Sequence, residues 1–64
     1  MTNGEAHKLG AQFKEGVAKF DPRLATWEIF SKTFGFFQWK KKQQPPLTDE
    51  NLEALAKGFR GEPL

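Results

Sequence analysis

Apolar residues recur every three or four positions through the first third of the chain. Between residues 4 and 20 they are Ala6, Leu9, Phe13, Val17 and Phe20. On a helical wheel these positions form one stripe of about 80°, which is typical of a helix that packs on one side. Thr2 or Asn3 is suited to cap such a helix, because either side chain accepts hydrogen bonds from free backbone N–H groups. The pattern predicts a helix over residues 4–20.

Two glycines lie beside this apolar stripe. Gly10 and Gly16 each cost a helix about 1 kcal/mol relative to alanine. Two explanations stay open: another helix approaches closely at these positions, or the helix is locally weak.

A second helix is predicted after the sequence "FDPRL". Asp21 suits an N-cap, and Pro22 suits the first helical position, where no backbone N–H is needed. Gly35 suits the residue just beyond the helix end, so we expect a helix over residues 22–34. Its apolar residues occupy more than one face, with Ile29 apart from the main stripe, which indicates two packing neighbours or a homodimer through this helix.

A third helix is predicted near the end of the chain. Residues 35–47 are expected to form a connection, because Pro45 and Pro46 exclude helix there. Thr48 suits an N-cap, and Leu47 with Leu52 fits a hydrophobic staple. We therefore expect a helix over residues 48–60, ended by Gly58 or Gly61.

These patterns together predict an all-α protein with three short helices in a single domain, residues 1–64. No stretch alternates with the period of two that a strand requires. Helices this short are barely stable alone in water, so they must pack on one another. The expected interior consists of Leu9, Phe13, Val17, Phe20, Leu24, Trp27, Phe30, Phe34, Leu52, Leu55 and Phe59.

Composition narrows the chemistry that such a domain can carry. The chain of 64 residues has no cysteine, and His7 is its one histidine. This excludes disulfide bonds and argues strongly against a structural zinc site, so the core must rely on ordinary packing. No nucleophile lies at a supporting spacing from a base, and the glycines never form a phosphate-binding loop. We expect no catalytic residues, no cofactor and no metal.

Charge and hydropathy place the protein in a broad class. The net charge is +2. Residues 1–44 contain eight Lys or Arg and four Asp or Glu, whereas residues 45–64 contain two Lys or Arg and four Asp or Glu. No apolar run approaches the roughly 20 residues of a membrane-spanning helix, and the N-terminal residues lack the apolar core of a signal peptide. We expect a soluble intracellular protein, cytoplasmic by default.

The segment from residue 35 to residue 46, "GFFQWKKKQQPP", is the most unusual feature of the sequence. Phe36, Phe37 and Trp39 add ring area to an interior that is already full for this length. Three rings exposed together would exceed the apolar patch that soluble monomers usually tolerate. They must either seal one end of the helical bundle or bind another molecule.

The favoured interpretation is a non-enzymatic, accessory or regulatory protein that docks to a larger protein or assembly. In this hypothesis Phe36, Phe37 and Trp39 are the anchors and Ile29 adds to them. The lysines Lys40, Lys41 and Lys42 steer an acidic partner surface, as charged rims do at many interfaces.

Two other kinds of partner fit the same residues. Lys40–Lys42 would neutralise phosphates while Trp39 stacks on a base, as in proteins that bind single-stranded nucleic acid. The rings and lysines would also suit an anionic membrane surface, where aromatic side chains and basic residues bind together. The three interpretations predict different responses to salt, to lipid and to loss of the rings.

Overall fold

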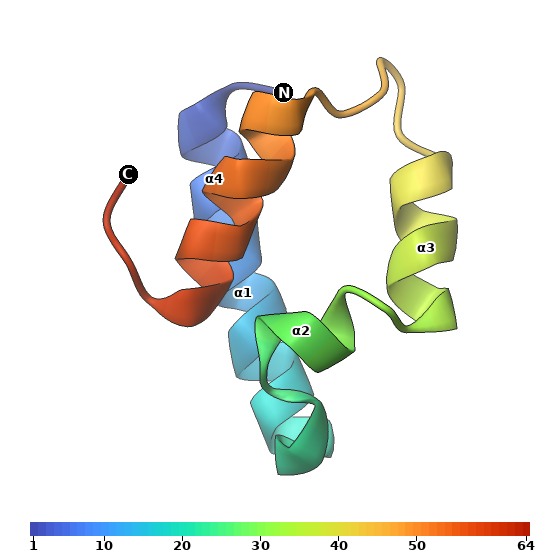
Figure 1. Ribbon diagram of the computed structural model, residues 1–64, viewed down its shortest axis with the longest axis vertical. Coiled ribbons are helices and arrows are strands. Elements are labelled where there is room, and N and C mark those ends of the chain that lie inside the picture. The colour runs from blue at the N-terminus through green and yellow to red at the C-terminus, as the bar shows by residue number, and fades with distance from the viewer.

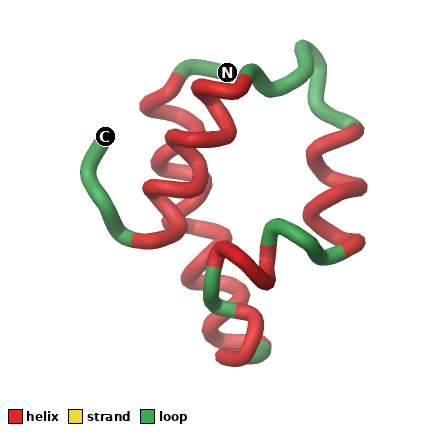
Figure 2. Tube along the Cα trace, viewed as in Figure 1, coloured by secondary structure: helices red, strands yellow, loops and turns green.

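The computed structural model describes all 64 residues, and every regular element in it is helical (Figures 1 and 2). In chain order the elements are α1 (Asn3–Phe20), the 3₁₀ helix η1 (Pro22–Leu24), α2 (Trp27–Phe30), α3 (Phe34–Lys41) and α4 (Asp49–Arg60). The predicted all-α class is therefore confirmed. None of these helices combines the length and the apolar character that crossing a membrane demands.

Helix α1 begins where the sequence predicts it, because its first turn is closed by a capping box. The Thr2 hydroxyl accepts a hydrogen bond from the Glu5 backbone N–H at 3.1 Å, and the Thr2 N–H donates to the Glu5 carboxylate at 2.8 Å. Hydrogen bonds donated to the Glu5 carboxylate, by the Thr2 backbone N–H first and then by the Thr2 side chain, lower the pKa of Glu5, because they favour its charged form. The predicted helix over residues 4–20 is confirmed.

Helix α4 has well-defined caps at both ends. Thr48 and Asn51 form a second capping box, and Gly61 ends the helix with a left-handed backbone at φ 78°. The Asn51 side chain is buried, and its amide donates to the Asn3 side-chain oxygen at 2.9 Å, which ties the starts of α4 and α1 together. The predicted helix over residues 48–60 is confirmed, with Thr48 as the cap and Asp49 as the first helical residue.

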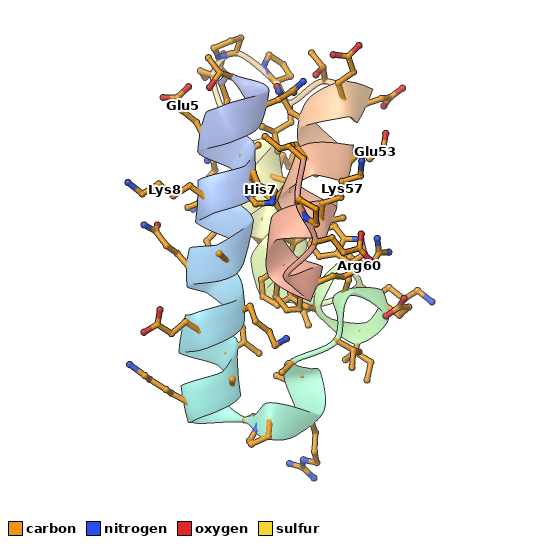
Figure 3. All side chains as sticks on the ribbon, turned by 90° about the vertical axis from the view of Figure 1, so that its left-hand side faces the viewer. Glu5, His7, Lys8, Glu53, Lys57 and Arg60 are labelled. Atoms are coloured by element: carbon orange, nitrogen blue, oxygen red, sulfur yellow. The ribbon has the colours of Figure 1, made fainter.

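Helices α1 and α4 lie side by side and make the most extensive helix contact of the fold (Figures 1 and 3). Ala6 and Leu55 are fully buried between them. The backbones approach very closely, because a Cβ atom on Gly10 would overlap the Leu55 carbonyl oxygen and one on Gly58 would overlap the His7 carbonyl oxygen. Close approach therefore explains Gly10, whereas Gly16 faces open space.

The C-terminal tail is held against the same helix pair. The His7 ring donates a hydrogen bond from Nε2 to the Glu62 carbonyl oxygen. Figure 3 shows His7 on the side of α1 that faces α4 and the tail, whereas Glu5 and Lys8 point away from them. His7 thus has a structural contact in the fold.

The predicted helix over residues 22–34 is wrong. Asp21 caps only the single 3₁₀ turn of η1, and its side chain pairs with Arg23. The Arg23 side chain and then its backbone N–H hold the pKa of Asp21 below its ordinary value. The chain then becomes extended at Thr26, whose hydroxyl accepts from the Ile29 N–H at 3.4 Å and starts the four-residue helix α2. Because Thr26 caps a new helix, the chain cannot continue as one helix from residue 22 to residue 34.

The predicted connection over residues 35–47 is also wrong in its first half. Residues 34–41 form α3, and Gly35 lies inside this helix and does not end one. Thr33 is the cause, because its hydroxyl accepts from the Phe36 N–H at 3.2 Å and donates to the Phe30 carbonyl oxygen at 2.8 Å. The true connection is the stretch from Lys42 to Thr48, which contains both prolines of the predicted stop.

Helix α3 stands apart from the α1–α4 pair in the ribbon (Figure 1), and aromatic side chains link it to the rest of the fold. Phe36 meets Trp27 edge to face at 5.3 Å, and Trp39 meets Phe13 at 5.0 Å. Phe30 stacks on Phe59 of α4 at 4.9 Å. The aromatic cluster comprises Phe13, Trp27, Phe30, Phe36, Trp39 and Phe59.

Candidate functional site

The three aromatic residues of the predicted surface lie in different environments. Phe36 is 6% exposed and belongs to the core, so it offers little of its ring to a partner. Trp39 is half-buried, with its ring against Phe13. Phe37 is exposed over 51% of its surface. Of the three rings, Phe37 alone is free to meet another molecule.

Two phenylalanines that the sequence places in the interior are exposed instead. Phe20, the last residue of α1, is 86% exposed, and Phe34 is 75% exposed. Phe34 turns outward because α3 begins there. Residues three apart share a helix face, so Phe34 and Phe37 lie together on the outer face while Phe36 and Trp39 lie together on the inner one.

An open hollow of about 780 Å³ lies beside this outer face. We call it the α3 groove. It is lined by Ser31, Lys32, Thr33, Phe34, Phe36, Phe37, Lys40 and Lys41. The groove therefore combines two exposed rings and the edge of a core ring with three ammonium groups.

The lysines of this region carry uncompensated charge. Ion pairs join Lys19 to Glu15, Arg23 to Asp21, and Arg60 to Glu28. None of them involves a lysine between residues 32 and 42. The sequence has no acidic residue from position 29 to position 48, although four lysines lie there. The α3 groove is thus a purely basic surface around exposed rings.

One lysine of the groove also contacts a ring within it. The Lys41 ammonium nitrogen lies 6.0 Å from the centre of the Phe37 ring, at the outer range of a cation–π contact. The two side chains are one helical turn apart on α3. Their contact places positive charge directly beside the exposed apolar surface.

The remaining predicted residues lie at or beyond the margin of the groove. Lys42 is exposed at the C-cap of α3, next to Lys41. Ile29 is 47% exposed on α2 and does not line the groove. Sequence reasoning missed Phe34 and Lys32, and the signal that could have found them is Thr33, which marks the start of a new helix and hence a new outer face.

The opposite side of α3 offers a smaller hollow of about 190 Å³, between Phe13, Phe30 and the inner face of α3. It has no charged lining residue. Elsewhere no three His, Asp or Glu side chains gather where they could hold a metal ion. Among the features of the molecule, the α3 groove alone brings together exposed rings and unpaired charges.

The fold and the groove describe a small all-α protein with a basic, aromatic surface on one short helix. No protein family matches the chain, and no curated protein or solved structure matches it either.

Proposed function

We propose that this protein works by binding a larger protein or assembly, as an accessory or regulatory component, and that the α3 groove is the binding surface. The observation that carries the proposal is the exposure of Phe34 and Phe37 side by side beside unpaired lysines. Exposed rings have an unfavourable contact with water that a partner would remove. Central aromatic anchors with charged surroundings are the usual anatomy of protein interfaces.

The size of the anchor sets an expectation for affinity. Two phenylalanine rings cover roughly 300–500 Å² when fully buried, which is less than the roughly 800 Å² that each partner contributes to a standard interface. The rings would form the centre of the contact, and the lysines its rim. We expect a weak, transient complex, unless further surface joins the contact.

The alternative partners fit this surface less well. The ring expected to stack on a base, Trp39, is half-buried against Phe13, so a base would have to stack on Phe34 or Phe37 instead. A lipid surface is flat on the scale of a side chain, whereas the α3 groove is hollow. A hollow favours a partner with a projecting side chain.

Site-specific photo-crosslinking tests the proposal. A benzoyl-phenylalanine at position 37 should capture one predominant protein in the native host, and the purified protein should then bind this chain in vitro. The matched control carries the same group at position 20, where a phenylalanine is more exposed but lies outside the groove. Capture of lipid or nucleic acid at position 37, or equal capture from both positions, would refute a protein-binding groove.

The double substitution F34S/F37S provides the corresponding loss of function. Because both rings are exposed, each substitution should change the free energy of unfolding by no more than about 0.5 kcal/mol, and the pair by no more than about 1 kcal/mol. Binding to the captured protein should be lost, whereas F20S should keep it. If the double variant unfolds, the two rings are part of the core and the proposal loses its anchor.

A further inference from the structure

The shape of the α3 groove limits what kind of protein segment enters it. Phe34 and Phe37 form its apolar wall, and the edge of Phe36 reaches it from the core. A large apolar side chain is the group that best covers this wall, because burying the exposed faces of Phe34 and Phe37 against it removes apolar surface from water. The partner segment must therefore project at least one such side chain.

The positions of the lysines constrain the charge of the same segment. Lys32 precedes α3, whereas Lys40 and Lys41 end it, so positive charge lies at both ends of the apolar wall. The helical rise of about 1.5 Å per residue places Lys41 about 10 Å along the axis from Phe34. Carboxylates that approach these lysines must therefore flank the apolar side chain on both sides.

A second copy of this chain meets the two conditions less well. Two α3 grooves face to face would bring lysines against lysines. The acidic start of α4 carries Asp49 and Glu50, but Leu52, the large apolar side chain of that turn, packs against the core. Leu64 is exposed beside Glu50 and Glu53, but Lys57 lines the same hollow and would face the lysines of the groove, so a second copy fits less well than an acidic segment.

We propose that the α3 groove binds an acidic amphipathic segment of the partner protein. In this complex a large apolar side chain covers Phe34 and Phe37, and carboxylates on either side of it approach Lys32 and Lys40–Lys41. The proposal rests on the binding function proposed above and adds the chemistry of the partner. It predicts that charge and apolar contact are both required.

Synthetic peptides of about 15 residues, long enough to form a helix on the surface, separate these requirements. The first peptide has Leu and Phe on one face and Glu on both flanks. One twin has Lys in place of Glu, and a second has Ala in place of Leu and Phe. Binding to the full chain is followed by fluorescence anisotropy, and the site by NMR shifts of the groove amides. We expect the acidic amphipathic peptide to bind at least about tenfold more tightly than either twin.

Charge reversal on the protein gives the reciprocal test. K40E/K41E should weaken binding of the acidic peptide by roughly tenfold and strengthen binding of the Lys twin. The matched control K8E/K19E changes the net charge equally on α1, away from the groove, and should change binding by less than about twofold. F37S should weaken binding of the acidic peptide by about as much as the replacement of Leu and Phe by Ala in the peptide does.

Several outcomes would overturn the inference. Equal binding of the Ala twin and the parent peptide would reduce the groove to a charged patch. Displacement of the labelled peptide by an oligothymidylate, or by vesicles of phosphatidylcholine and phosphatidylserine, at a lower concentration than the unlabelled peptide requires would assign the groove to nucleic acid or to lipid. If position 37 captures a protein whose bound segment is basic or uncharged, the binding function stands and the acidic segment is wrong. If it captures no protein, the binding function itself fails.

Discussion

At the scale of single residues, the contact between α1 and α4 depends on two glycines. A Cβ atom on Gly10 would overlap the Leu55 carbonyl oxygen and lie 2.8 Å from the Phe59 backbone nitrogen. Neither atom can move away alone, because both belong to the α4 backbone. Gly16 lies on the same helix and meets nothing within 4 Å. The fold therefore requires glycine at position 10 but leaves room for a larger side chain at position 16.

The substitutions G10A and G16A should change the free energy of unfolding in opposite directions. G16A should stabilise the protein by about 1 kcal/mol, because alanine favours the helix. G10A should destabilise it, since forcing the two helices apart costs about 1–3 kcal/mol and outweighs the helix preference. Urea unfolding followed by circular dichroism measures both values. Stabilisation by G10A would contradict the close approach of α1 and α4.

At the scale of elements, caps decided which predictions succeeded. The helices over residues 4–20 and 48–60 could be predicted because Thr2 and Thr48 precede a single regular apolar stripe. The middle of the chain could not, because Thr26 and Thr33 each start a new helix inside what looks like one continuous apolar pattern. Periodicity does not reveal such a change of axis.

The different start of the helix also explains why the sequence pattern placed Phe34 in the interior and Phe36 on the surface. With one helix over residues 22–34, Phe34 belongs to the interior and Phe36 to the surface. With α3 starting at Phe34, the two exchange places. The chain does leave aromatic rings exposed, namely Phe34 and Phe37. Which rings are exposed depends on the direction of α3, and the Thr33 hydroxyl fixes where this helix starts.

Phe36 and Trp39 hold α3 against the rest of the molecule, and this gives a prediction at the element scale. F36A removes a core ring that contacts Trp27 and Phe30, and Phe→Ala substitutions in a core cost about 3–5 kcal/mol. F34A, on the same helix and exposed, should cost no more than about 0.5 kcal/mol.

Urea unfolding measures this difference in the free energy of unfolding. In a Trp27→Phe background, the fluorescence of Trp39 should also shift to longer wavelength in F36A, because the undocked ring meets water. The F34A variant is the control and should keep the parent spectrum. Equal losses of stability in F34A and F36A would mean that α3 packs with its other face inward.

At the scale of the whole molecule, charge is distributed in two parts. The basic surface lies on and beside α3, and acidic residues begin α4 at Asp49 and Glu50. A chain of 64 residues buries a limited share of its surface, so a small protein like this gains much from any contact that covers its exposed rings. The charges decide which contacts form, because the rings alone do not distinguish a partner from a second copy.

The α3 groove therefore predicts opposite salt dependences for self-association and for partner binding. Pairing of two grooves is opposed by their lysines, and at about 0.1 M salt charges more than about 10 Å apart are largely screened. The chain should be monomeric at low salt by sedimentation equilibrium, and any self-association should increase as salt is added. Binding of the acidic peptide should weaken over the same range of salt concentration, because salt also screens the attraction between its carboxylates and the lysines of the groove. A dimer that forms at low salt and dissociates on adding salt would contradict this, since it would mean that the lysines of one copy bind the acidic start of α4 in another.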